Sequence, residues 1–346
     1  MVKKVEYQLF QNVFVKKITK KIGELAQMTW ILFATFILQK PLLIIANWLP
    51  SFFDYIFFVY PGTESDMNGV VPKWFAKNPR FRTQICLGGI LTKSKTGFSG
   101  RGIVVGAPNT VRNMVASKEE CILLKERLEK FANCFSINAI AIAGRGPSIL
   151  LHHNIILDEP FVHGRRGMVF CTIATLEAIL KKHQMSLQNT NIVIFGAGDV
   201  GNNIANFLIA RHCKIKIVSA QSVFDKNKIC MANFDIDALR GADIVIVISA
   251  KGSDIYPHMK KLKDGAIIID DTHPRMTRLF KRGYVYRAAL TMEGSWFIPR
   301  LPVYGSKSIP GCVVEAMVYA IYGQILDQEE FNRVAFKIGL RAYDIK

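Results

Sequence analysis

The sequence lacks the cysteine patterns of a metal-binding or disulfide-stabilised protein. Its seven cysteines are odd in number and include no Cys-x-x-Cys pair, which speaks against a zinc ribbon and a disulfide framework. No other metal site of recognisable spacing is present. Most of the cysteines stand among apolar residues, as small core side chains do. A reducing, cytoplasmic compartment is the simplest interpretation.

Acidic residues are scarce. The 346 residues include 27 Asp and Glu against 45 Lys and Arg, which gives a formal net charge of +18. Such a charge favours a nucleic acid, an anionic membrane or an acidic carrier protein as partner. Because the basic residues are spread out and no nucleic-acid-binding module is recognisable, a nucleic acid is the least favoured of the three.

Long uninterrupted apolar runs are also missing, although the N-terminal region is strongly apolar. Within Leu25–Tyr60 the only charged residues are Lys40 and Asp54, and Pro41 and Pro50 divide the stretch. A spanning helix needs about 20 apolar residues, a length that only the stretch from Pro41 to the end of this region approaches.

We interpret residues 1–75 as a basic and hydrophobic segment in which residues 22–60 form a monotopic helical hairpin on the cytosolic face of a membrane. A single transmembrane span and a buried dimerisation arm are the alternatives. A secretory signal is not favoured, because no small-residue cleavage site stands out.

One stretch in the second half of the chain carries the strongest signal. The apolar run Ile192–Phe195 predicts a buried strand, Gly196-Ala197-Gly198-Asp199-Val200-Gly201 follows it, and an amphipathic helical pattern comes next. This context is typical of dinucleotide binding. Gly196 would allow a tight turn, Gly198 the approach of a pyrophosphate, and Gly201 close helix–strand packing. A structural turn in another α/β sheet is the alternative.

Further apolar segments alternate with helical spacers. We expect strands at 214–219, 242–250, 266–270 and 284–288. This pattern predicts an α/β fold with a Rossmann-type doubly wound parallel sheet over residues 189–300. Ligands bind such sheets at the carboxyl ends of the strands, which places Ser249 and Asp270 at the cofactor.

The residues after the second expected strand bear on the choice of cofactor. An NAD-binding domain usually has an acidic residue there for the ribose hydroxyls. Here Ser219 and Gln221 stand at this place, and no carboxylate precedes Asp225. Hydroxyls and the nearby lysines suit a 2′-phosphate, so we predict NADPH rather than NADH.

Residues 76–188 predict a smaller α/β substrate domain. We expect strands at 99–105 and 139–143 and helices at 118–134 and 167–182. A glycine-flanked basic loop, His163–Gly167, precedes the second helix. Its Arg165 and Arg166 would clamp a phosphate or form an exposed basic turn.

A second motif lies in the C-terminal helical segment, residues 301–346. Pro310 and Gly311 precede a helical pattern, which puts Cys312 in the first helical turn. A thiol at a helix N-terminus has a lowered pKa and more thiolate character. Glu315 would cap this helix or lie beside Cys312 on one face. A buried, unreactive cysteine is the alternative.

Taken in order, these motifs resemble the long-chain acyl-[acyl-carrier-protein] reductases, which form fatty aldehydes. The resemblance covers about residues 99–323. The segment Gly311–Met317 resembles the one that holds the family's nucleophilic cysteine, at the Cys and at Glu-Ala-Met. Gly198–Gly201 resembles its Gly-Asp-Ile-Gly. Shorter matches in the same order are 141–148, Glu177-Ala178 and Ile269-Asp270 with Pro274.

The resemblance implies NADPH-dependent reduction of an acyl thioester, on an acidic acyl carrier protein or coenzyme A, through a Cys312 acyl-enzyme. Glu315 matches the family motif beside the nucleophile. His273, which stands where the family has Tyr, is a proton-donor candidate or a surface residue. Gln221 replaces an Arg of the family. The alternatives are another Rossmann oxidoreductase, similar to shikimate dehydrogenase or glutamyl-tRNA reductase, and a non-catalytic membrane-tethered nucleotide-binding protein.

Overall fold

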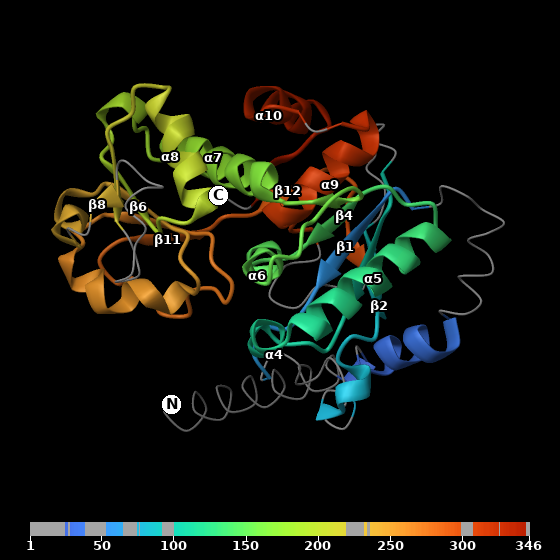
Figure 1. Ribbon diagram of the computed structural model, residues 1–346. Helices are drawn as coiled ribbons and strands as arrows, with labels where there is room; N and C mark the ends of the chain where they lie inside the picture. The colour runs from blue at the N-terminus through green and yellow to red at the C-terminus, as the bar shows by residue number, and fades with distance from the viewer. Residues whose placement is uncertain are drawn as a thin grey trace, which may run out of the picture.

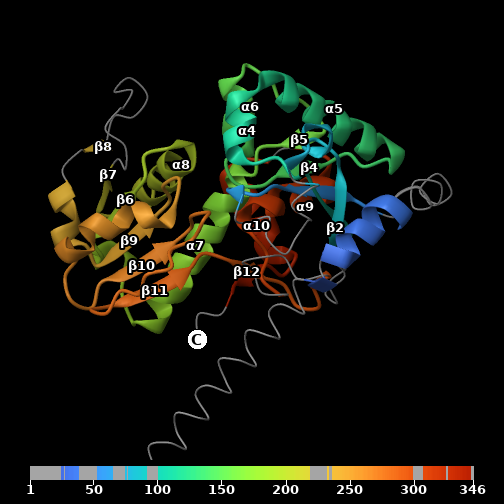
Figure 2. The same ribbon diagram turned by 90° about the horizontal axis from the view of Figure 1, so that it is seen from below.

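The computed structural model describes residues 25–26, 28–38, 53–64, 75, 77–91, 100–218, 232–233, 236–298, 307–324 and 326–343. Two six-stranded sheets form the framework of this part of the chain. Figure 1 shows them as two lobes, with helix α7 (Arg165–Lys182) between the lobes. Figure 2 shows the same arrangement from below.

The second lobe contains an all-parallel sheet with the order β11-β10-β9-β6-β7-β8. In chain order the strands run 3-2-1-4-5-6 from the β8 edge, which is the Rossmann arrangement. The strands are β6 (Ile192–Phe195), β7 (Ile215–Val218), β8 (Ala232–Asn233), β9 (Ile244–Val247), β10 (Ile267–Asp270) and β11 (Tyr284–Arg287). The predicted doubly wound α/β fold is confirmed. Helices on both faces bury β6, β9 and β10, so their sequences are continuously apolar.

The first lobe contains a mixed sheet with the order β13-β2-β3-β1-β4-β5. Its strands are β1 (Tyr55–Val59), β2 (Cys86–Leu91), β3 (Gly102–Gly106), β4 (Ile140–Ile142), β5 (Phe161–Val162) and β13 (Phe297–Ile298). The inner pairs β3-β1-β4-β5 are parallel, whereas β2 is antiparallel to both of its neighbours, β3 and β13. The strands expected near 99–105 and 139–143 are present as β3 and β4.

Strand β1 corrects the interpretation of the N-terminal region. Tyr55–Val59 had been included in the membrane hairpin, but this strand pairs with β3 on one side and β4 on the other. Its side chains Tyr55–Phe58 are buried inside the protein. The apolar run is therefore a central strand, and the first lobe begins before residue 76. Most of the remaining hairpin, including 39–52, lies outside the described residues.

Two further observations concern the ends of the predicted domains. Strand β13 pairs with β2, so the chain returns to the first sheet slightly before residue 301. Within the described residues, none of the helices combines the length and apolar character needed to cross a membrane.

Helices cover both faces of the first sheet. Ile56 and Phe58 face a core built with α4 (Val111–Ala116), α5 (Lys118–Cys134) and α6 (Gly146–His152). Tyr55 and Phe57 face the opposite core, which contains α7 and α9 (Gly311–Tyr322). Helix α5 has the predicted bounds, and Ser117 caps it by accepting a hydrogen bond from the Glu120 N–H.

The other described elements are short or peripheral. They are η1 (Ala34–Leu38), η3 (Pro79–Phe81), η4 (Leu187–Asn189), α8 (Asp199–Ile209), η5 (Ile236–Gly241), η6 (Gly252–Lys261), β12 (Leu290–Thr291), α10 (Gln328–Lys337) and β14 (Arg341–Ala342).

Helices α7 and α9 approach closely at their N-terminal ends because glycine stands at the contact. A Cβ built on Gly167 would lie 2.2 Å from the carbonyl oxygen of Gly311. A Cβ on Gly311 would lie 2.8 Å from the Cβ of Cys171. Both positions therefore require glycine. This contact sets the first turn of α9, with Cys312, against the start of α7.

Candidate active site

The glycine turn, Gly196–Gly201, has the geometry that its sequence predicts. Gly196 has φ +133°, and a Cβ there would lie 2.8 Å from the backbone of Ile248. A Cβ on Gly201 would lie 2.1 Å from the Gly196 oxygen, whereas one on Gly198 would meet nothing within 4 Å. The outer two glycines are packed and the middle one is open. This is the surface that a pyrophosphate needs for close approach.

Helix α8 begins at the glycine turn without a side-chain cap. Its N-cap is Gly198, and no side chain accepts from the first helical N–H groups, so these donors and the positive end of the helix dipole are available to an anion. Asn202 closes the turn by donating to the carbonyl oxygens of Ala197 and Gly198 at 3.2 and 2.9 Å. The turn therefore has the residues to hold a dinucleotide.

Ser249 lies beside the glycine turn, after the end of β9. A Cβ on Gly196 would lie 2.9 Å from the Ser249 nitrogen. The carboxyl ends of β6 and β9 thus meet where the strand order reverses, the place at which ligands bind open α/β sheets. Ser219 and Gln221, which are predicted to lie at the 2′-phosphate of NADPH, are outside the described residues.

Asp270 holds together the loop that follows β10. Its buried carboxylate accepts from the Thr272 N–H at 3.1 Å, from the Thr272 hydroxyl at 2.5 Å and from the Met276 N–H at 2.8 Å. Arg287 forms an ion pair with it at 3.2 Å. Both oxygens are therefore engaged within the protein. Asp270 thus orders the loop after β10, and its place at the cofactor stays a prediction.

Cys312 lies in the first turn of α9, as predicted, and is only 8% exposed. The backbone groups of Gly144, after β4, of Cys312 itself and of Val313 favour the ionised sulfur and so act to lower the pKa of the thiol. Gly164, at the entry to α7, packs so closely that a Cβ there would lie 3.0 Å from the Cys312 oxygen. Backbone groups from two segments distant in sequence, the one after β4 and the start of α9, thus act on the sulfur.

The predicted lowering of the Cys312 pKa is wrong for this conformation. Burial raises the pKa of the thiol to about 11, and the charge of Asp271 adds to the rise. The backbone N–H groups act in the other direction, as the helix N-terminus argument requires. Loss of hydration of the thiolate is the larger effect, so the resting residue is a thiol.

Asp271 is the titratable residue that the sequence reasoning missed. It is buried at the carboxyl end of β10, and its Oδ2 accepts a hydrogen bond of 2.6 Å from the Thr172 hydroxyl of α7. Burial raises its pKa to about 7, against the opposing effect of Arg287. Its charge acts on Cys312. Its place directly after a predicted strand was the available signal. His273, two residues further on, is exposed.

Tyr60 also belongs to this region, although its sequence position had suggested a membrane segment. It follows β1, and its hydroxyl lies 3.5 Å from the positions that a Cβ on Gly144 or Gly146 would occupy. Burial, and then the charge of Cys312, raise the pKa of Tyr60 well above its usual value. We refer to Cys312, Gly144, Asp271 and Tyr60 as the thiol site.

Glu315 does not cap its own helix. Its Oε2 accepts from the backbone N–H of Arg166 at 2.9 Å, and its Oε1 pairs with the Arg166 guanidinium at 3.1 Å. It therefore caps α7, because the two helices meet at their N-terminal ends. The capping-box prediction is wrong, and Glu315 positions the first turn of α9 relative to α7.

Arg165 and Arg166, the two residues of the expected phosphate clamp, form ion pairs within the protein. Helix α7 starts at Arg165, two residues earlier than predicted, so both arginines are helical. Arg166 is engaged by Glu315. Arg165 forms an ion pair of 3.4 Å with Asp199 of the glycine turn. The two arginines therefore connect α7 to α9 and to the glycine turn.

No family model and no curated protein matches the chain. Among solved structures, a glycerate dehydrogenase related protein from Thermoplasma acidophilum is 16% identical, with 32% of this chain and 47% of that one covered and a TM-score of 0.24. An NAD-dependent malic enzyme from Thermotoga maritima is 16% identical, with 68% and 65% covered and a TM-score of 0.38. The matched part thus spans less than two thirds of either of these proteins.

A third similar structure matches over most of both chains. It is an N5,N10-methylenetetrahydrofolate dehydrogenase-cyclohydrolase from Trypanosoma brucei, complexed with NADP cofactor and inhibitor. It is 14% identical, with 86% of this chain and 94% of that one covered and a TM-score of 0.34. The Rossmann assignment of the present chain rests on its own strand order and glycine turn.

Proposed function

We propose that this protein is an NADPH-dependent oxidoreductase that reduces a long-chain acyl thioester, on an acyl carrier protein or coenzyme A, to a fatty aldehyde. The observation that carries the proposal is the thiol site: a nearly buried cysteine at a helix N-terminus, on which backbone groups and the charge of a buried carboxyl group act. The order of the sequence motifs supports the same reaction. Arg165 and Arg166 connect the elements that hold the two sites.

The glycine turn fits the cofactor. Its open Gly198 and the uncapped start of α8 suit the pyrophosphate. When bound, NADPH supplies the hydride that reduces the acyl carbon. Ser249 lies next to the turn, on the side of the neighbouring strand β9.

The chain's own groups account for acyl transfer. The ionised Asp271 carboxylate accepts the Cys312 thiol proton, directly or through a water molecule, and the sulfur attacks the thioester carbonyl. A new sulfur–carbon bond forms as the bond to the carrier sulfur breaks, and the carrier thiolate takes the proton from Asp271. The backbone N–H groups around the sulfur, including those of Gly144 and Val313, stabilise the oxyanion.

The same groups serve the second half of the reaction. After reduction of the acyl carbon, the oxyanion on the Cys312 adduct collapses to the aldehyde, and the sulfur–carbon bond breaks. Because burial raises the Cys312 pKa to about 11, the released thiolate takes up a proton, and the thiol is restored. Asp271 replaces His273 as the proposed proton-transfer group, since Asp271 is buried and its charge acts on Cys312, whereas His273 is exposed.

Intact-protein mass spectrometry tests the proposal. Incubation with palmitoyl acyl carrier protein or palmitoyl-coenzyme A without NADPH is expected to give an acyl adduct on Cys312. Addition of NADPH is expected to remove the adduct and release aldehyde. Cys134→Ser is the matched control, because Cys134 is an exposed cysteine on α5, and its adduct is expected to match the wild type. A protein that binds NADPH but forms no adduct would contradict the acyl-enzyme.

A further inference from the structure

Residues 28–38 carry an exposed apolar face. Trp30, Phe33, Phe36 and Ile37 are 38% to 58% exposed, although they are large apolar side chains. Their spacing places them on one side of the helical segment. Ile31 and Ala34 point the other way and are buried, Ile31 against Phe75 and Cys86 and Ala34 in the core beneath α5. The helical segment is thus fixed to the protein by one face and exposes the other.

Basic residues stand beside this face. The ring of Phe36 contacts Phe75 edge-on at 5.8 Å, and Phe75 stacks on Phe81 at 4.7 Å. This aromatic chain holds the neighbouring stretch against the helical segment, and Lys77 and Arg80 in that stretch are exposed. An apolar face rich in Trp and Phe therefore has a positively charged border.

We propose that Trp30, Phe33, Phe36 and Ile37 insert into the interface of an anionic lipid bilayer, with Lys77 and Arg80 against the headgroups. Aromatic side chains favour the membrane–water interface, and each basic residue near an anionic surface adds attraction. The first 21 residues, which precede the segment, contain six Lys and one Glu, so the charge of the adjoining sequence has the same sign. The positive charge beside the apolar face therefore favours an anionic bilayer as the partner that covers this face.

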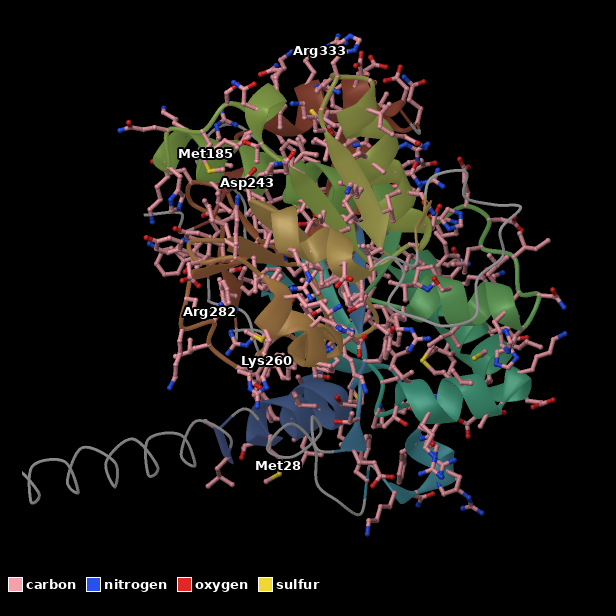
Figure 3. The ribbon with its side chains drawn as sticks, turned by 90° about the vertical axis from the view of Figure 1, so that its left-hand side faces the viewer. Met28, Met185, Asp243, Lys260, Arg282 and Arg333 are labelled. Carbon is pink, nitrogen blue, oxygen red and sulfur yellow. The ribbon has the colours of Figure 1, made fainter. Side chains whose placement is uncertain are left out.

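The position of the face suits a peripheral anchor. Ala34 packs in the core that contains α5, on the sheet face opposite to α9 and Cys312. Figure 3 shows Met28, at the beginning of the segment, on the underside of the molecule. A membrane bound there leaves the thiol site on the other side of the first sheet. The inference is independent of the chemistry proposed at Cys312.

Vesicle co-sedimentation of the full-length protein tests the proposal. Wild type is expected to bind vesicles of phosphatidylcholine with phosphatidylglycerol more tightly than phosphatidylcholine alone. The double variant Phe33→Glu/Ile37→Glu is expected to bind roughly tenfold more weakly or worse, because two inserted apolar side chains become charged. Lys77→Ala and Arg80→Ala are each expected to weaken binding to the anionic vesicles about fivefold.

Leu279→Glu is the matched control, because Leu279 is an 81% exposed apolar residue in the other lobe; it is expected to bind vesicles like the wild type. Thermal melting checks that each variant remains folded. Unchanged binding of Phe33→Glu/Ile37→Glu would overturn the proposal. The proposal would also be overturned if the wild type did not bind vesicles but formed a dimer, and if Phe33→Glu/Ile37→Glu were monomeric. The apolar face would then bind a second copy of the chain.

Fluorescence provides a second readout that does not depend on charged variants. In a chain with Trp48, Trp74 and Trp296 replaced by Phe, Trp30 is the only remaining tryptophan of the four. Brominated lipids in anionic vesicles are expected to quench its emission. Unquenched Trp30 emission from vesicle-bound protein would overturn the insertion of this face.

Discussion

The glycine turn and the thiol site are built in opposite ways. The glycine turn comes from six consecutive residues, Gly196–Gly201, and its geometry follows from steric demands within and beside that stretch. The thiol site brings together Tyr60, Gly144, Asp271 and Cys312, from four separate segments. The geometry of a contiguous motif can be predicted from its sequence. In a site assembled from distant segments, burial determines the pKa values, and the sequence of a single segment does not predict that burial.

Removing the thiol is expected to give the largest difference between the two sites. Cys312→Ala should lower turnover about a thousandfold or more, because the covalent route is lost, while NADPH affinity stays within twofold of wild type. Steady-state kinetics and a nucleotide-binding titration measure the two quantities. Cys134→Ala is the control and should keep wild-type turnover. Retained turnover in Cys312→Ala would break the comparison, because the thiol site would not be catalytic.

The contact between α7 and α9 is expected to carry the next largest effect. Glu315→Ala should lower the free energy of unfolding by about 2–4 kcal/mol, because it leaves the mostly buried Arg166 guanidinium without its carboxylate. Urea denaturation measures this change. Glu329→Ala is the control, since its ion pair with Arg211 is exposed and should be worth less than about 1 kcal/mol. Equal effects would show that Glu315 does not hold the two helices together.

Two substitutions in the glycine turn separate binding from folding. Gly198→Val should weaken NADPH binding by about 1–3 kcal/mol through steric exclusion, with unchanged stability, because nothing lies within 4 Å of its Cβ position. Gly201→Val should instead lower the melting temperature, since its Cβ would lie 2.1 Å from the Gly196 oxygen. Calorimetric titration and thermal melting measure the two effects. Tight NADPH binding by Gly198→Val would place the pyrophosphate elsewhere.

Counted per pH unit, the smallest expected effect is a pH dependence at Asp271. Burial raises its pKa from 3.8 to about 7, so the folded protein keeps a proton that the unfolded chain releases. This contribution to stability is complete below about pH 4 and is lost as pH rises toward 7. The Asp271→Asn variant cannot ionise at this position. As the pH rises through this window, the free energy of unfolding of the wild type should therefore fall relative to that of the variant, by at most about 1.4 kcal/mol per pH unit.

Urea denaturation of both proteins from pH 5 to 8 measures this difference. A difference that is independent of pH would mean that Asp271 titrates normally. The activity profile sharpens the result: if Asp271 accepts the Cys312 proton, wild-type turnover should rise with pH through about 7, and the Asp271→Asn profile should lose that step.

Sequence periodicity predicted an element correctly where its local pattern and its tertiary packing favour the same structure. Strands β6, β9 and β10 of the Rossmann sheet are fully buried apolar runs, and α5 begins after Ser117 and ends at Cys134 as its pattern predicts. Tyr55–Val59 shows where this reasoning fails. A buried central strand and a membrane segment have the same apolar composition, and only pairing with β3 and β4 distinguishes them.

The sequence by itself determined the Rossmann lobe, the packed positions of Gly196 and Gly201, the open position of Gly198, and the place of Cys312 at a helix start, because each depends on neighbouring residues and backbone sterics. The tertiary structure alone decided that Glu315 caps α7, that the charge of the buried Asp271 acts on Cys312 and that the thiol has a raised pKa. These properties depend on contacts between distant segments and on the exclusion of water, which arise only when the chain is packed.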